Sequence, residues 1–134
     1  MSHLHLNAEE IQNLLQSEFG KSYQIGRSQT FESENHKRFI LSKSKEYDNG
    51  FFWSSYDFAS FSENRINYFV LAVAKYGILV LPVEIFASYA PFTSKLKSGR
   101  DNIRIQRKAD KFYLVGKKPF VDVELTPYFR KLQK

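Results

Sequence analysis

Two strongly apolar segments in the middle of the chain constrain its fold more than any other feature. Residues 67–74 and 78–81 are apolar at nearly every position, and a short turn that ends at Gly77 joins them. A strand with one solvated face alternates apolar and polar residues, whereas a strand covered on both faces is apolar throughout. The pattern therefore predicts two paired central strands. The core residues that we expect from them are Leu71, Val73, Leu79 and Leu81.

The N-terminal segment predicts a helix. Asn7 is followed three residues later by Glu10, which is the spacing of a capping box. The apolar residues that follow have helical spacing as far as Phe19, and Gly20 is a typical helix stop. We expect the helix to cover residues 8–19.

Turn signals predict further hairpins. Asn49-Gly50 separates a strand expected at residues 38–45 from an aromatic strand at 51–58, and Asn-Gly favours a two-residue hairpin turn. A second hairpin is expected around Ala109-Asp110, with arms at 103–108 and 111–117. Residues 21–36 are polar and irregular, so we assign no strand to them.

These elements predict an α+β fold with an N-terminal helix, short helices on one face and a mostly antiparallel sheet of about five to six strands built from hairpins. The 134 residues fit a single domain. Residues 1–6 are expected to be a frayed tail, and residues 95–134 form a basic hairpin region. A closing helical turn is expected at 126–132, because Pro127 suits a first helical position.

Several classes of function are excluded by what the sequence lacks. Without cysteine there is no disulfide framework, thiolate zinc site, iron–sulfur cluster or cysteine nucleophile. Gly77 and Gly99 stand alone, so no glycine-rich phosphate loop is present, and we expect no cofactor and no metal site. No apolar run reaches the roughly 18 residues that predict a membrane span, and no secretory signal is visible. We expect a cytoplasmic protein that does not bind membranes.

Positive charge is concentrated in the last third of the chain. Residues 1–94 contain eight Lys and Arg against ten Asp and Glu, whereas residues 95–134 contain twelve against four. The C-terminal segment thus carries a net charge of +8, which attracts polyanions. We predict nucleic acid as the partner and favour DNA. A homo-oligomer or a larger complex is also compatible with the sequence.

The basic hairpin supplies most of the candidate contacts. Alternation places Ile103 and Ile105 on one face and Arg104, Gln106 and Lys108 on the other. Arginine binds phosphate or guanine through two hydrogen bonds, and glutamine can read adenine. Further basic candidates lie in the flanking loops, namely Lys95, Lys97, Arg100, Lys117 and Lys118.

Aromatic residues make up 16% of the chain, and most of them are expected in the core. Alternation along residues 51–58 puts Trp53 on a face that also carries polar groups. Bases stack on exposed aromatic rings beside basic residues. Trp53 and Tyr113 are therefore predicted to stack bases.

Three other interpretations stay open. A metal-dependent nuclease could use the carboxylates of Asp57 and Glu84, but the sequence contains no Glu-x-Lys motif, so we favour a protein without catalytic activity of its own. A non-enzymatic domain could bind an acidic protein partner through the same basic surface. The charge could also serve solubility alone.

The apolar middle of the chain has a family resemblance over residues 50–86. Phe51-Phe52-Trp53, Tyr68-Phe69-Val70-Leu71 and Ile78-Leu79-Val80-Leu81-Pro82, followed by Ile85, loosely resemble small α+β domains of bacterial restriction and defence proteins. The resemblance implies a DNA-recognition or nuclease-associated domain in a restriction, defence or regulatory system. It assigns no catalytic residue.

Overall fold

The computed structural model describes residues 5–26 and 29–132. Its helices are α1 (Ala8–Phe19), α2 (Ala59–Glu63) and α3 (Ile85–Tyr89). Its strands are β1 (Ser22–Ile25), β2 (Thr30–Ser33), β3 (Arg38–Ser44), β4 (Phe51–Tyr56), β5 (Tyr68–Val73), β6 (Gly77–Pro82), β7 (Asp101–Lys108), β8 (Lys111–Leu114), β9 (Val123–Glu124) and β10 (Phe129–Lys131).

The strands form two sheets. The first has the order β1-β2-β3-β5-β6-β10 and the second has the order β4-β7-β8-β9. Neighbouring strands are antiparallel apart from β3 and β5, which are parallel. The α+β class and the mostly antiparallel pairing agree with the sequence prediction. The prediction placed all strands in one sheet, whereas the chain leaves the first sheet after β3 and begins the second with β4.

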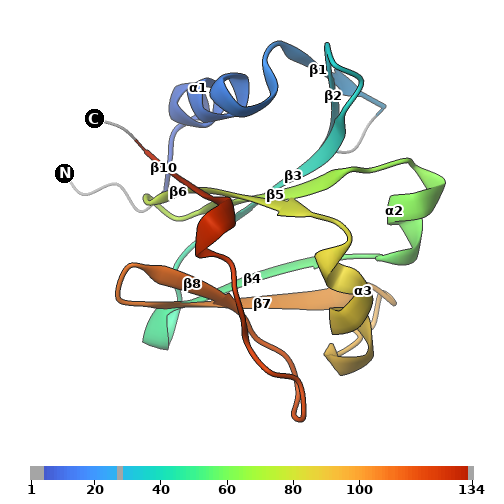
Figure 1. Ribbon diagram of the computed structural model, residues 1–134, viewed down its shortest axis with the longest axis vertical. Coiled ribbons are helices and arrows are strands. Elements are labelled where there is room, and N and C mark those ends of the chain that lie inside the picture. The colour runs from blue at the N-terminus through green and yellow to red at the C-terminus, as the bar shows by residue number, and fades with distance from the viewer. Residues whose placement is uncertain (1–4, 27–28, 133–134) are drawn as a thin grey trace.

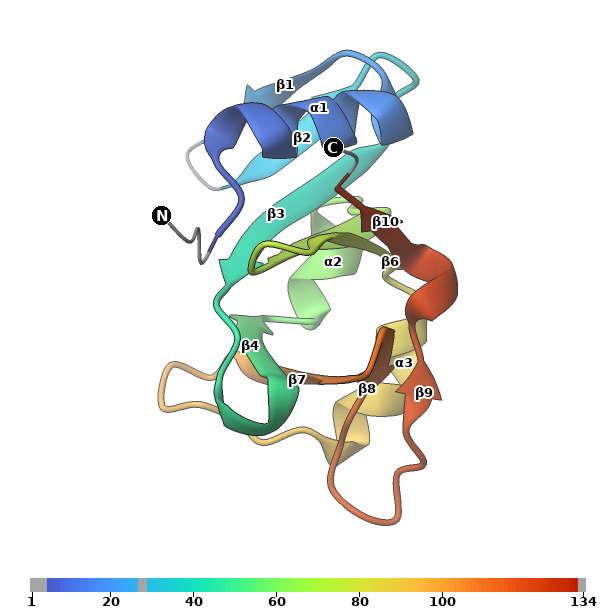
Figure 2. The same ribbon diagram turned by 90° about the vertical axis from the view of Figure 1, so that its left-hand side faces the viewer.

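The molecule is layered, with α1 on one face of the first sheet and the second sheet against the other (Figure 1). Apolar residues of α1, including Ile11 and Leu15, pack with Phe39, Val70 and Val80 of the first sheet. The opposite face of that sheet packs against the inner face of the second sheet, in a core that also includes residues of α2 and α3. Figure 2 shows the same order of layers from the side.

The central strands and the N-terminal helix are confirmed. β5 and β6 pair in antiparallel register, and the side chains of Leu71, Val73, Leu79 and Leu81 are all 0% exposed. At the start of α1, the Asn7 side chain accepts a hydrogen bond from the Glu10 N–H, and the Glu10 side chain accepts one from the Asn7 N–H. Both features follow from local sequence.

The turn expected at Asn49-Gly50 is present, but the two strands that were predicted to pair across it do not form a hairpin. Both residues have positive φ, 66° and 76°, as the turn chemistry requires. However, only Tyr47 and Phe51 pair across the turn. β3 instead pairs in parallel with β5, and β4 pairs with β7. The turn motif fixes the local backbone, but burial of the apolar strands decides which strands pair.

Three strands were missed because they are short and lie toward sheet edges. β1 and β2 form a hairpin within residues 21–36. The closing helical turn expected at 126–132 extends only over Thr126–Tyr128, and β10 replaces the rest of it along the edge of β6. Their burial patterns are mixed rather than alternating. Hydrogen bonding to a preformed sheet stabilises such segments more than their own composition does.

Leu6, which belongs to the tail expected to be frayed, is buried. Residues 1–4, which include His3, lie outside the described residues. Leu6 is 6% exposed, and its N–H donates to the Ala74 carbonyl oxygen over 3.0 Å. The side chain of Leu6 packs in the α1 layer and fixes the start of the helix.

Candidate nucleic-acid interface

The outer face of the second sheet carries the predicted row of polar side chains. Along β7, Ile103 and Ile105 are buried at 0% exposure, whereas Arg104 and Gln106 are partly exposed and Lys108 is exposed. The alternation inferred from the sequence is therefore confirmed. Since β7 lies between β4 and β8, the row belongs to a broad sheet face and not to a protruding two-stranded ribbon.

Strand register places aromatic rings beside this row. Trp53 of β4 lies directly opposite Arg104, and Phe51 lies opposite Gln106. On the other side, Tyr113 of β8 also lies opposite Gln106. Residues opposite each other in an antiparallel pair share a face, so the register unites both predicted stacking residues with the basic row. The alternation that points to Trp53 also places Phe51 on this face.

Arg104 forms the centre of a cluster with two aromatic rings, which we call the Arg104 cluster (Arg104, Phe51 and Trp53). Its guanidinium carbon lies 4.5 Å from the Phe51 ring centroid and 5.4 Å from that of Trp53. Its Nε is buried and has no hydrogen-bond partner among the described residues. Within residues 5–26 and 29–132 no carboxylate forms an ion pair with it, and the two ring faces stabilise its charge.

A buried tyrosine holds the backbone on both sides of this cluster. The Tyr89 hydroxyl donates to the Val115 carbonyl oxygen over 2.6 Å and accepts from the Arg104 N–H over 3.1 Å. Burial raises the pKa of Tyr89 more than the hydrogen bond from Arg104 lowers it. Tyr89 is therefore a neutral bridge between β7 and the end of β8, a role that no local sequence pattern indicates.

Three other predicted contacts on this face already have partners. The Gln106 amide donates to the Asn49 carbonyl oxygen over 3.1 Å. The Lys108 ammonium lies 5.3 Å from the Tyr113 ring centroid and 3.9 Å from an Asp122 carboxylate oxygen. The side of the face toward β9 is thus partly neutralised, and the unpaired charge lies around Arg104.

The cations of the loop that precedes β7 (residues 93–100) differ in whether they have an acidic partner. Lys95 pairs with Asp101 over 2.7 Å, and the Asp101 side chain is only 2% exposed. Burial alone would raise the pKa of Asp101, but hydrogen bonds from Lys95 and from the Phe58 N–H outweigh it and lower the pKa. Lys95 therefore stabilises the fold, whereas Lys97 and Arg100 remain exposed.

The two lysines after β8 also differ in position relative to the Arg104 cluster. Lys117 lines a small cavity of about 110 Å³ together with Trp53, Asn102 and Arg104. Its backbone N–H donates to the Phe92 carbonyl oxygen, which fixes its place beside the face. Lys118 is exposed and does not line this cavity. The structure thus brings Lys117, but not Lys118, to the Arg104 cluster.

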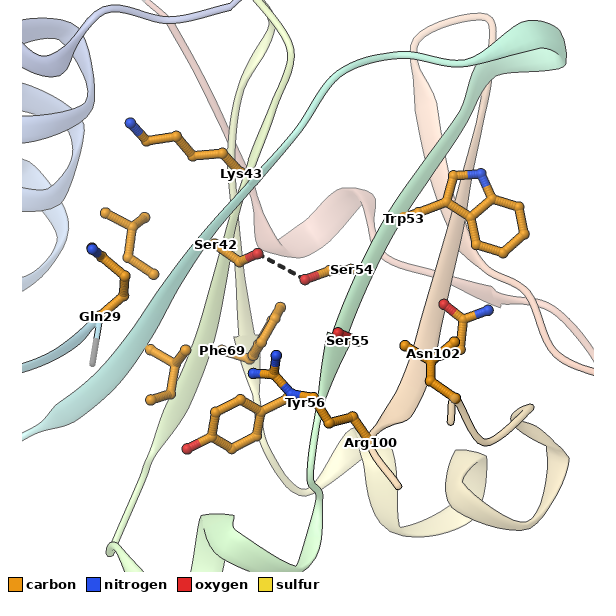
Figure 3. A pocket seen from close by; sticks show the side chains of 13 residues that line it. Gln29, Ser42, Lys43, Trp53, Ser54, Ser55, Tyr56, Phe69, Arg100 and Asn102 are labelled. Atoms are coloured by element: carbon orange, nitrogen blue, oxygen red, sulfur yellow. Dashed lines mark hydrogen bonds between the residues drawn. The ribbon is translucent and has the colours of Figure 1, made fainter. Parts of the chain in front are cut away.

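A larger cleft of about 500 Å³ lies on the other side of Trp53, between β3 and β4 (Figure 3). Ser42 and Ser54 share a hydrogen bond of 2.7 Å across it, and Arg100 and Lys43 lie at its sides. The Arg100 guanidinium carbon is 6.0 Å from the Tyr56 ring centroid. Lys43 was not singled out from the sequence, where it is one of several strand lysines.

The carboxylates considered for a nuclease are both exposed. An Asp57 side-chain oxygen accepts from the Ala59 N–H over 3.2 Å at the start of α2, and Glu84 directly precedes α3. Within residues 5–26 and 29–132, no three His, Cys, Asp or Glu side chains come together as a metal-binding group. In the same ranges, no helix is both long enough and apolar enough to cross a bilayer.

In comparisons with family models, curated proteins and solved structures, nothing matches the chain.

Proposed function

We propose that the protein binds nucleic acid, with DNA as the preferred form, through the outer face of β4, β7 and β8. The observation that carries this proposal is the Arg104 cluster, in which the arginine lies over two aromatic rings and has no acidic partner among the described residues. Trp53, the more accessible ring, is 37% exposed. Aromatic rings stack on bases, and an adjacent arginine contacts phosphate or a base edge.

The surrounding charge supports a polyanion as the ligand. Among the described residues that line the cavity beside Arg104, two are cations and none is an Asp or Glu. The C-terminal segment supplies most of the positive charge of the chain. A face that carries the exposed Trp53 ring suits bases better than it suits the carboxylates of an acidic protein, because carboxylates gain nothing from stacking. The resemblance to DNA-recognition domains favours DNA, and a restriction or defence context stays a prediction.

The test is a binding titration of a labelled DNA oligonucleotide with wild type, Arg104→Gln and Arg65→Gln. Arg65 is an exposed arginine at the end of α2, away from the outer face, so its substitution removes the same charge elsewhere. We expect Arg104→Gln to weaken binding about tenfold, as for loss of a charged hydrogen bond, and Arg65→Gln to change it little. Equal losses of DNA affinity in both variants would show that only the net charge of the protein matters.

Polyglutamate of similar length serves as the competitor. If the face recognises bases as well as charge, DNA is displaced poorly by polyglutamate at matched charge concentration. Equally effective displacement would favour an acidic protein partner. Absence of DNA binding at low salt would overturn the proposal, since low salt strengthens every phosphate contact.

A further inference from the structure

The cleft between β3 and β4 exists because two strands lose their neighbours at the same place. β3 pairs with β2 only as far as Ile40, so its last residues extend beyond that neighbour. β4 is the edge strand of the second sheet and diverges from β3 as the chain changes sheets. Hydrogen bonds between Ser42 and Ser54 and from the Trp53 N–H to Ser44 Oγ hold the floor of the gap.

The cleft is suited to an anion. Among the described residues that line it, Lys43 and Arg100 are cations and none is an Asp or Glu, although the chain contains fourteen acidic residues. Figure 3 shows Lys43 and Arg100 on opposite sides of the Ser42–Ser54 hydrogen bond. Lys43 alternates with Ser42 along β3, so its side chain leaves the strand on the other face, and it borders the cleft from the β3 side.

This cleft is continuous with the proposed nucleic-acid face. Trp53 and Asn102 line both the cleft and the small cavity beside Arg104. The cleft and the small cavity therefore meet at these two residues, which we call the Trp53 ridge. Arg104 and Lys117 lie on one side of it, and Arg100 and Lys43 lie on the other. Asp122 and Glu124 lie toward β9, and Asp101, the acidic residue of β7 nearest the cleft, is buried and paired with Lys95.

Resting on the proposed function, we propose that an unpaired strand crosses the Trp53 ridge and places one nucleotide in the cleft, with Arg100 and Lys43 binding its phosphates. Pockets that hold small ligands have volumes of roughly 300–1,000 Å³, and one nucleotide is a ligand of that class. In a duplex the bases are paired and stacked on each other, so they cannot stack on Trp53. The preferred ligand is therefore single-stranded nucleic acid.

Trp53 allows a direct measurement, because it is the only tryptophan of the chain. An unlabelled single-stranded DNA oligonucleotide and the duplex of the same sequence are titrated into the full chain while tryptophan fluorescence is recorded. We expect quenching at lower concentration with the single strand, by about tenfold or more, because an unpaired base can stack on Trp53. Equal affinity for both forms would overturn the inference.

The phosphate contacts are tested with Arg100→Gln, Lys43→Gln and the double variant, against Lys75→Gln as the matched control. Lys75 is an exposed lysine in the β5–β6 turn and does not line the cleft. The double variant should bind the single strand about tenfold more weakly or worse and lower the salt slope by ~0.7 per lost contact. Arg100→Lys should restore much of the loss. Matching unfolding midpoints would show that the variants are folded.

The results separate the two proposals. If Arg104→Gln weakens binding but the cleft variants behave like Lys75→Gln, the face binds nucleic acid and the cleft inference is wrong. If the wild type binds no nucleic acid, the proposed function itself fails. If the cleft variants weaken binding of the single strand but leave binding of the duplex unchanged, as expected for a site that excludes paired bases, the inference is supported.

Discussion

The two sheets of the molecule are built from similar apolar strands but differ in how much of each is covered. β5 and β6 of the first sheet have α1 on one face and the second sheet on the other, and almost all their side chains are buried. β7 of the second sheet buries only alternate residues. One sheet is therefore a stability element, and the other leaves a face free to bind a partner.

The difference is visible in the type of side chain that each strand can accept. Burial of both faces stabilises a continuously apolar strand, and an unpaired charge in such a strand would be strongly destabilising. The outer face of β7 carries Arg104, whose charge is stabilised by ring faces rather than by an acid. Variants in the two sheets should accordingly separate stability from binding.

The largest expected effect is on the first sheet. Leu71→Ala removes a fully buried side chain from β5, and we expect the free energy of unfolding to fall by about 2–5 kcal/mol. Urea denaturation followed by circular dichroism measures it. Leu96→Ala, at an exposed leucine in the loop before β7, is the control and should cost much less. Similar costs for the two would contradict the assignment of the core.

A smaller loss is expected where the two halves of the second sheet are bridged. Tyr89→Phe removes the hydroxyl that joins the Arg104 N–H to the Val115 carbonyl oxygen, so two partly buried backbone groups lose this partner. The expected cost is about 1–3 kcal/mol in the same denaturation measurement. Tyr23→Phe removes a hydroxyl that bonds Glu32 at an exposed site and should be nearly neutral. Equal effects would mean that the Tyr89 bridge adds no stability.

Acid should weaken the attachment of the loop before β7. Since the pKa of Asp101 is lowered in the folded protein, the stability it contributes is fully present above its ordinary value of 3.8. That contribution is lost as pH falls through the lower folded pKa. Asp101→Asn should therefore flatten the stability profile below about pH 4, and Asp110→Asn, in the exposed β7–β8 turn, controls for net charge. An unchanged acid slope in Asp101→Asn would refute this role.

The smallest effect on stability is expected on the outer face. Lys108→Gln should change the free energy of unfolding by no more than ~0.5 kcal/mol, because the side chain is 57% exposed and its ion pair with Asp122 is long. Its effect on DNA affinity should also be smaller than that of Arg104→Gln, because Asp122 already neutralises part of its charge. A greater loss of binding in Lys108→Gln than in Arg104→Gln would move the proposed contact toward β9.

Local sequence predicted the elements whose stability is local. The Asn7–Glu10 cap, the turn between β5 and β6, and the alternation of Ile103, Arg104 and Ile105 each depend on residues within a few positions. The same is true of the positive φ at Asn49 and Gly50. Such features follow from steric limits and hydrogen bonds of neighbouring residues, which the order of the residues specifies directly.

Tertiary structure alone decided which segments meet. The register of β4 against β7 brings Trp53 to Arg104 across some fifty residues of chain, and the bond from Tyr89 to Val115 joins residues 26 positions apart. Lys43 reaches the cleft only because β3 and β4 separate into different sheets. Period and composition specify which face of a strand is apolar, but not which other strand covers it. That choice is made by the burial of the whole core, to which every strand contributes at once.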